Sequence, residues 1–475
     1  MQTGERLSLL LKIFLPLLLL VVLQAYPVSY AVVDNLKEAQ IARQQERPLE
    51  AAEALRRVLG QQPWRTQLWE EIAWQEHAAG RFDQAVYAFQ QADQAGVLSA
   101  DGRFQLAEDT FQLGDGPAAE AVLQDLLRKQ GPSDRAYDRL AQFQRARRDY
   151  PAVVNTLRAW RGFAPQDAQV AFKLGMHLMI LEPDEAAPLL VEAGQKNSGL
   201  TPAVLTLRRG LGQASNADDP AYGWLMIGRA LGSIEQWDLA VEAFQKAVDL
   251  SANYAEAWGF LSEARYQVDG SGKTELEKAL ALAPESPVVR ALAAIYWRRL
   301  GEPQRALEHL QAIAAQEPDQ PVWKVEIAHT LIDIGDLTTA QEYLEQAIEL
   351  APESSIYWQY LARFSAEYQV DPSGMGLPAA RKAILLAPDD PAALDTMALV
   401  MMRLGDGASA ERFLQRALKS DATYAQAYLH LGQIFLQQDT RRAYPYLKRA
   451  AELAGETPTG ITARRLLMTY FGEGG

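Results

Sequence analysis

The sequence predicts an all-α solenoid of about twelve helix pairs, with an apolar leader or anchor helix before it and a capping helix after it. Three observations predict this fold. Small residues recur about every 34 positions, Gly and Pro occupy the intervals between repeats, and helix-forming residues fill the segments between them. Runs of Val and Ile with period-two alternation are scarce, so a sheet is not expected.

A small residue that follows a large apolar one marks the first helix of each pair. Small side chains let two antiparallel helix backbones approach closely, and large residues three and four positions away fill the space between them. Twelve positions form this series: Ala39, Ala73, Ala107, Ala141, Gly175, Gly228, Ser262, Ala294, Ala328, Ala362, Ala398 and Gly432.

A second small residue lies twelve positions later in most copies, and a large apolar residue follows it by four, as Ala85 and Phe89 illustrate. In the fifth copy this spacing selects Ala187 and Val191. Proline near the end of many copies, such as Pro352, prevents the second helix from continuing. Glycines between the two helices are expected to form left-handed caps, at Gly80, Gly114, Gly301, Gly335 and Gly405.

This pattern resembles the tetratricopeptide repeat family over about residues 32–457. The fifth copy departs from the pattern at Pro183 and Pro188. The resemblance implies a superhelix that binds a protein or peptide on a concave surface lined by the first helices. Two copies show the family pattern best, one with Trp224, Ile227, Gly228, Ala240, Phe244 and Ala247, the other with Trp69, Ile72, Ala73, Gly80, Phe82, Ala85, Phe89 and Ala92.

We expect the chain to divide into five segments. Residues 1–31 form a signal peptide or membrane anchor, 32–199 an array of five repeats, 200–220 an insertion helix and loop, 221–457 an array of seven repeats, and 458–475 a capping helix and tail. The insertion is either a hinge or a packed helix. The cap is expected to pack through one face formed by Ala463, Leu466, Leu467 and Tyr470.

The N-terminal segment predicts transport to the outer side of the cytoplasmic membrane. Arg6 and Lys12 precede eleven uninterrupted apolar residues, Ile13 to Leu23, and small residues follow at Ser29 and Ala31. This fits a cleaved signal peptide or a retained anchor, and both place the repeats outside because positive charge stays on the cytoplasmic side. A cytosolic protein with a buried N-terminal helix is the third interpretation.

Composition argues against several function classes. The net charge of −14 opposes nucleic-acid binding, and the absence of cysteine excludes disulfides and thiolate chemistry. The segment GSGKT from Gly270 to Thr274 lacks the glycine that a phosphate-binding loop needs at Gln267. The histidines stand in different copies, and no carboxylate pair is distinguished. We therefore expect no catalytic residue, no cofactor and no metal.

Eight residues occupy positions that the family resemblance places on the concave surface. They are the predicted partner-binding residues: Trp74, His77, Phe104, Phe111, Phe172, Met176, Arg229 and Arg298. The aromatic and Met members either line an open groove for an apolar or amphipathic peptide, or are buried against neighbouring first helices. The family's Lys and Asn clamp for chaperone C-terminal carboxylates is not present at these positions.

Two functions remain compatible with the sequence. The first is a non-catalytic scaffold that binds a peptide or protein. The alternative is an accessory, substrate-docking subunit of a membrane-associated enzyme, such as a glycosyltransferase or a polymer-export complex.

Overall fold

The computed structural model describes residues 30–472; residues 1–29 and 473–475 lie outside the described part. Between residues 30 and 472 the chain forms 26 α-helices and no strand, which confirms the predicted all-α class. Contacts divide the chain into two compact units, unit 1 up to Ala243 and unit 2 from Phe244, so that the boundary falls within one helix, α14 (Trp237–Leu250).

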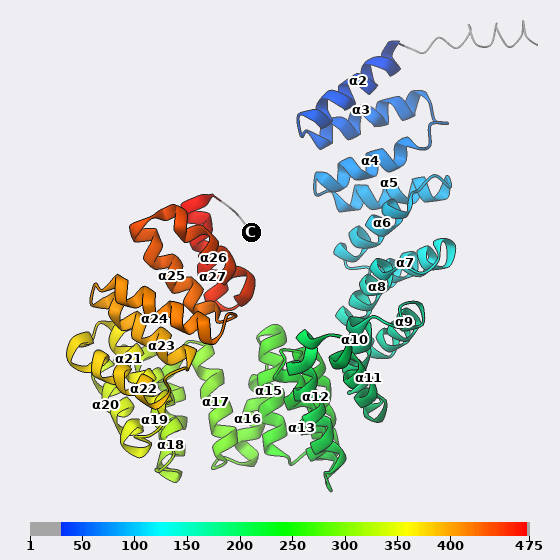
Figure 1. The fold of residues 1–475 in the computed structure, drawn as a ribbon. Helices are drawn as coiled ribbons and strands as arrows, with labels where there is room; N and C mark the ends of the chain where they lie inside the picture. Colours follow the sequence, from blue (N-terminus) through cyan, green and yellow to red (C-terminus); the bar gives the residue numbers. More distant parts are fainter. Residues whose placement is uncertain (1–29, 473–475) are drawn as a thin grey trace, which may run out of the picture. The chain divides into compact units, whose positions relative to one another are not determined.

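Unit 1 consists of consecutive antiparallel helix pairs, each packed on the next (Figure 1). The first helix of each pair carries the predicted small residue. The pairs, with one inserted helix before the last, are α2 (Tyr30–Gln44) and α3 (Pro48–Gln61), α4 (Leu68–Ala78) and α5 (Phe82–Gln94), α6 (Ala100–Gln112) and α7 (Gly116–Gln130), α8 (Asp134–Ala146) and α9 (Tyr150–Phe163), α10 (Ala168–Leu178) and α11 (Pro183–Lys196), the inserted α12 (Thr201–Ser215), and α13 (Pro220–Gly232) with α14.

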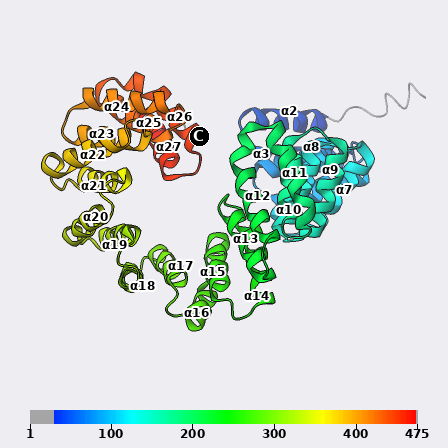
Figure 2. The same ribbon diagram turned by 60° about the horizontal axis from the view of Figure 1, so that its bottom comes forward.

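Unit 2 continues the same arrangement to a single final helix (Figure 2). The order is α15 (Ala255–Asp269) and α16 (Lys273–Leu282), α17 (Pro287–Arg299) and α18 (Pro303–Gln316), α19 (Pro321–Ile334) and α20 (Leu337–Leu350), α21 (Ser355–Tyr368) and α22 (Leu377–Leu386), α23 (Pro391–Arg403) and α24 (Gly407–Ser420), α25 (Ala425–Gln438) and α26 (Thr440–Ala454), then α27 (Pro458–Phe471).

All twelve small residues are buried where the two helices of a pair cross. Two glycines of this series, Gly175 and Gly432, show why the residue at the crossing must be small. A Cβ on Gly432 would lie 2.5 Å from Cδ2 of Leu447, and one on Gly175 would lie 3.0 Å from Cγ of Leu190. A side chain at either position would therefore require the facing leucine side chain to shift.

The second helix of the fifth repeat is shifted by one residue from the predicted register. In the fifth repeat Ala186 and Leu190 are fully buried, whereas the predicted Ala187 and Val191 are only half-buried, so that assignment was wrong. The cause is the loop between the helices. In most repeats the loop contains a left-handed residue, with φ of +72° at Gly80 for example, but the loop of the fifth repeat, residues 179–182, contains none, and the buried Ala186 follows Gly175 by eleven residues in place of twelve.

The predicted cap glycines Gly80, Gly114, Gly301, Gly335 and Gly405 all have positive φ. Three other repeats place Glu46, Arg148 and Glu235 at the same loop position, with φ between 54° and 60°. The turn at residues 369–376 is irregular: it contains left-handed Gln369 and Asp371, followed by a short π-helical turn.

The insertion is a packed helix within unit 1. In α12 the residues Val204, Leu207, Gly210 and Leu211 are buried between α11 and α13. The site of closest approach is Gly210, where a Cβ would lie 2.4 Å from Cβ of Ala230. A polar loop of four residues, 216–219, then leads into α13.

The two ends of the repeat array differ from the sequence prediction in detail. The predicted leader or anchor, residues 1–31, lies outside the described residues apart from Tyr30 and Ala31, which begin α2. From residue 30 to residue 472, none of the helices is long and apolar enough to cross a membrane. In α27 Ala463 and Leu467 are buried as predicted, but Tyr470 is 54% exposed.

Candidate functional site

Among the described residues, three cavities are lined mainly by first helices, one in unit 1 and two in unit 2; the side of the first helices that lines them is called the inward face below. The unit 1 cavity has a volume of about 340 Å³ and lies between α8 and α10. The unit 2 cavities have volumes of about 220 Å³, across α17, α19 and α21, and about 470 Å³, across α23, α25 and α27. The first helices are the elements on which the resemblance predicts partner binding.

The unit 1 cavity combines apolar and polar walls. Phe172 and Met176, two of the predicted partner-binding residues, line it from α10. Phe172 is half-buried and Met176 is 4% exposed, so the ring of Phe172 is the more accessible of the two. Val153 and Leu157 of α9 contribute further apolar wall, and both are buried.

The charged residues of this cavity are held in ion pairs. Arg145 donates from Nε to Oδ2 of Asp238 at 2.6 Å, and its Nη2 donates to both Oδ1 of Asp238 and Oε1 of Gln236. Burial alone would raise the pKa of Asp238, but the hydrogen bonds and positive charge of Arg145 outweigh burial and lower it. Lys173 pairs with Asp138 across the gap between α8 and α10.

A buried histidine forms another part of the wall. His177 is 3% exposed, and its Nδ1 lies 2.7 Å from the carbonyl oxygen of Lys173. Because a carbonyl can only accept, Nδ1 carries the proton and Nε2 is an acceptor. Nε2 has no hydrogen-bond partner. Burial is the main cause that lowers the pKa of His177, to about 4, so the ring is neutral at pH 7.

In unit 2, Arg298 lines the smaller cavity, where it is held by two carboxylates. Its Nε lies 2.9 Å from Asp333 and its Nη1 lies 3.3 Å from Glu326. The opposite walls of the cavity include His329 and Tyr360, whose rings meet edge to face at 5.4 Å. Burial lowers the pKa of His329, which keeps this ring neutral as well.

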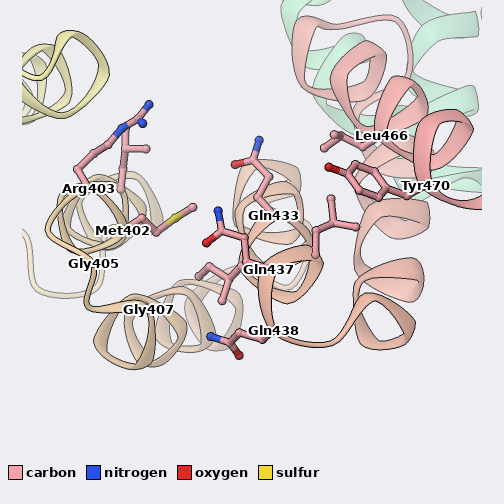
Figure 3. Close-up of a pocket in the computed structure, with 12 residues that line it drawn as sticks. Met402, Arg403, Gly405, Gly407, Gln433, Gln437, Gln438, Leu466 and Tyr470 are labelled. Carbon is pink, nitrogen blue, oxygen red and sulfur yellow. The ribbon is translucent and has the colours of Figure 1, made fainter.

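The largest cavity lies at the C-terminal end of unit 2 and carries unused polar groups (Figure 3). The amides of Gln433 and Gln437 on α25 lie between Met402 and Arg403 on α23 and Tyr470 on α27 (Figure 3). Within residues 30–472 the side chains of these two glutamines and of Arg403 have no hydrogen-bond or ion-pair partner. The wall contains no acidic residue.

The remaining predicted partner-binding residues lie outside these cavities. Trp74 packs edge to face on the core residue Phe89 at 5.5 Å, and Phe111 stacks on Phe143 with ring centroids 4.1 Å apart. The Phe104 ring is covered by the guanidinium of Arg135 at 3.7 Å.

The other two predicted residues differ in exposure. His77 is hydrogen-bonded to Asp109, with 2.9 Å between Nδ1 of the histidine and Oδ1 of the aspartate. Arg229 on α13 is exposed. Of the eight predicted residues, Phe172 and Met176 line the unit 1 cavity, Arg298 lines a cavity in unit 2, and the other five line none of the three cavities.

Sequence reasoning missed the polar residues that complete the unit 1 cavity. Arg145 lies four residues after Ala141, the same spacing that marked the predicted concave positions, so it could have been found. Asp238 could not have been found in this way, because it is 93 residues from Arg145 along the chain and the inserted helix lies between them. In the described part of the chain, no cluster of three His, Asp or Glu residues suitable for a metal is present.

Comparison with known proteins gives one family. Models of the tetratricopeptide repeat match residues 36–96, 221–254 and 298–364. The curated proteins contain no sequence that matches the chain.

Solved structures that align with the chain include yeast Tom70, at 15% identity and a TM-score of 0.45, covering 92% of this chain and 95% of that one. Another is Cut9 in the APC/C Cut9–Hcn1 hetero-tetramer, at 13% identity and a TM-score of 0.36, covering 90% and 95%. A third is MamA of Desulfovibrio magneticus RS-1, at 19% identity and a TM-score of 0.29, covering 36% and 97%. With three matches to the same repeat along an all-helical array of pairs, the chain is a tetratricopeptide repeat protein.

Proposed function

We propose that the protein is a non-catalytic scaffold that binds a protein or peptide along the inward face of its first helices. Repeats of this family in general bind proteins and do not catalyse reactions. The observation that carries the proposal is the C-terminal cavity of unit 2, where the partly buried Gln433 and the exposed Gln437 and Arg403 have no side-chain partner among residues 30–472 and are open to a ligand. No feature of the described residues favours the alternative of an accessory enzyme subunit.

The chemistry of this cavity suits an extended peptide. Gln433 and Gln437 lie one helical turn apart on α25, and each amide offers both a donor and an acceptor, as a peptide main chain requires. Met402 and Leu466 provide adaptable apolar contact on either side. Arg403 adds a positive charge, and the wall holds no acid that would neutralise it.

A double substitution tests the proposal against a matched control on the neighbouring helix α24. Arg403→Ala with Gln437→Ala removes one guanidinium and one amide from the inward face. Arg412→Ala with Gln415→Ala removes the same groups from exposed positions on the second helix α24. We expect the first pair to reduce capture of bound protein from cells at least about tenfold, because each lost charged or polar contact contributes about 1 kcal/mol or more. Capture should be unchanged in the second pair. Equal capture by both variants would contradict the proposal.

We also propose that the repeats act on the outer side of the cytoplasmic membrane. The support is the sequence alone, Arg6 and Lys12 ahead of the apolar run from Ile13 to Leu23. Protease added to intact spheroplasts should digest the repeats. Complete protection until the spheroplasts are lysed would place the repeats inside and contradict this proposal.

A further inference from the structure

Four helices at the C-terminal end of unit 2 are strongly basic (Figure 1). The second helices α22, α24 and α26 and the cap α27 together contain eleven Lys and Arg residues and two Asp and Glu residues, a net charge of +9. The nine second helices before them, from α3 to α20, contain eleven Lys and Arg and eighteen Asp and Glu, a net charge of −7. The sign of the charge therefore changes at the last three repeats.

Most cations of these four helices have no partner of opposite charge in the protein. Four of the eleven form ion pairs, at Lys382, Arg442, Arg449 and Arg464. Among residues 30–472 the other seven have no carboxylate partner, and all are exposed; we call them the basic surface: Arg381, Arg412, Arg416, Lys419, Arg441, Lys448 and Arg465. Only solvent ions balance their charge, so it is available to an external anion.

The rest of the chain has the opposite charge. Since the whole chain carries −14 and the four helices carry +9, the remaining residues carry −23. An extended anionic body would repel most of the molecule and attract this end, so that the charge distribution itself orients the contact.

Two exposed apolar side chains accompany the cations at the same helical spacing. Leu385 of α22 is 73% exposed and Met468 of α27 is 67% exposed, the highest values for large apolar side chains between residues 31 and 472. Each follows two cations by three and four residues, in the segments RKAIL at 381–385 and RRLLM at 464–468. Because residues three and four apart share one side of a helix, each apolar side chain projects beside cations.

This arrangement suits a lipid surface better than a protein or a nucleic acid. Neither Leu385 nor Met468 lines any of the three inward cavities, so neither belongs to a pocket described above. A protein anchor is usually matched by a pocket, whereas the boundary between headgroups and acyl chains accepts isolated apolar side chains. Cations spread over four helices match many headgroups and not a single carboxylate. Nucleic acid supplies many phosphates but no apolar phase.

We propose that the basic surface binds an anionic lipid bilayer, with its cations at the headgroups and with Leu385 and Met468 in the boundary between headgroups and acyl chains. The contact is peripheral and reversible, because it combines electrostatic attraction with only two inserted side chains. None of the seven cations lines the C-terminal cavity of unit 2, so the inward face stays free for a partner while the membrane is bound.

Single-cysteine labelling of the full-length chain tests the proposal, because the chain contains no cysteine. Leu385→Cys and Met468→Cys each carry a fluorophore that brightens in an apolar environment. Tyr87→Cys is the control, since Tyr87 is 51% exposed on the acidic second helix α5. We expect the first two labels to brighten with phosphatidylcholine vesicles that contain about 30% phosphatidylglycerol, and not with phosphatidylcholine alone. The control label should respond to neither.

The comparison of the two vesicle types removes any contribution of the apolar run from Ile13 to Leu23, because an apolar segment enters both.

Two fourfold substitutions with the same change in net charge test the cations in the Met468→Cys chain. The first replaces four members of the basic surface by Gln: Arg416, Lys419, Arg441 and Lys448. The second replaces four exposed cations of unit 1 by Gln: Arg128, Lys129, Arg208 and Arg209. Each cation near an anionic surface increases partitioning about fivefold, so the first variant should lose the brightening at least about tenfold. The second should keep it, with helicity compared for both.

The proposal is overturned if neither label responds to anionic vesicles, if both vesicle types brighten the labels equally, or if the control label brightens as much. Equal loss in the two fourfold variants would also contradict it. An equal response to soluble poly-glutamate or duplex DNA would overturn the assignment to lipid. None of these outcomes affects the capture experiment on Arg403 and Gln437, so the membrane contact and the scaffold proposal can fail separately.

Discussion

Glu46, Arg148 and Glu235 occupy the loop position that glycine occupies in other repeats, and they hold a left-handed backbone there. A residue with a Cβ pays roughly 1–2 kcal/mol for this conformation. In most repeats a left-handed residue ends the first helix and directs the chain into the second. These three loops are therefore local weak points of unit 1.

Substitution of Arg148 by Gly should stabilise unit 1 by up to about 1 kcal/mol, since relief of the left-handed strain exceeds the extra chain entropy of glycine. Arg148 is exposed at φ 58°, so little contact is lost. Chemical denaturation of the two proteins measures the difference. Arg148→Ala is the control, because it removes the same side chain and keeps the strain, and it should not stabilise. Equal stabilisation by Ala and Gly would show that the side chain, and not the backbone, is responsible.

His177 provides a pH-dependent contribution to stability. Its folded pKa of about 4 lies below the ordinary value of 6.5, because burial disfavours the imidazolium and the charge of Arg145 adds repulsion, and these effects outweigh the opposing effects of the hydrogen bond to the Lys173 carbonyl and of Asp238. Between pH 6.5 and 4 the unfolded chain binds a proton that the folded chain does not, so the stability from this group falls as pH falls, by about 3 kcal/mol in total.

We expect the His177 ring to remain neutral at pH 5 in an NMR titration. Between pH 7 and pH 4.5, His177→Asn should lose less stability than the unaltered chain, since the variant has no imidazole to protonate at this site. A midpoint for His177 near 6.5 would contradict the burial argument.

At the scale of the helix, the close crossing of paired helices depends on the small residue in the first one. Gly432→Ala should destabilise unit 2 by about 1–3 kcal/mol, because the added Cβ would lie 2.5 Å from Leu447. Gly60→Ala is the matched control in α3, where a Cβ meets nothing within 4 Å, and it should stabilise by about 0.5–1 kcal/mol through helix propensity. Thermal unfolding of the two variants measures both effects, and equal destabilisation would contradict the packing explanation.

The sequence was sufficient to predict the helix pairs because the spacing of small residues such as Ala73 and Ala107 repeats over hundreds of residues. It was less informative where a loop changed length by one residue. In the fifth repeat Ala186 and Ala187 are both alanine, so the shift leaves no trace in the small-residue pattern itself.

The cavity was predicted only in part for a different reason. The contact of Arg145 with Asp238 depends on how the inserted helix α12 packs, which periodicity does not encode.

At the scale of the whole molecule, a repeat array has an exposed apolar end that a terminal helix must cover. On α27 the side chain of Leu467 is only 7% exposed, whereas that of its neighbour Met468 is 67% exposed. Leu467→Ser should therefore destabilise unit 2 by about 2–4 kcal/mol, whereas Met468→Ser should change stability by less than about 0.5 kcal/mol.

Removal of residues 458–475 should cause self-association of the chain, which light scattering detects, because the face that Leu467 covers is then open to solvent. A soluble monomer of unchanged stability after this deletion would show that α27 is not a cap.

The central claim, that the inward face of the first helices binds the partner, is tested most directly by site-specific photocrosslinking in cells. A photoreactive residue is placed at inward positions, Gln142 of α8 and Met402 of α23, and at exposed positions on second helices, Phe163 of α9 and Leu385 of α22. The account predicts that both inward positions crosslink to the same protein, at different segments of its chain, and that the two outward positions do not. Crosslinking of a common partner through Phe163 and Leu385, with none through Gln142 and Met402, would contradict it.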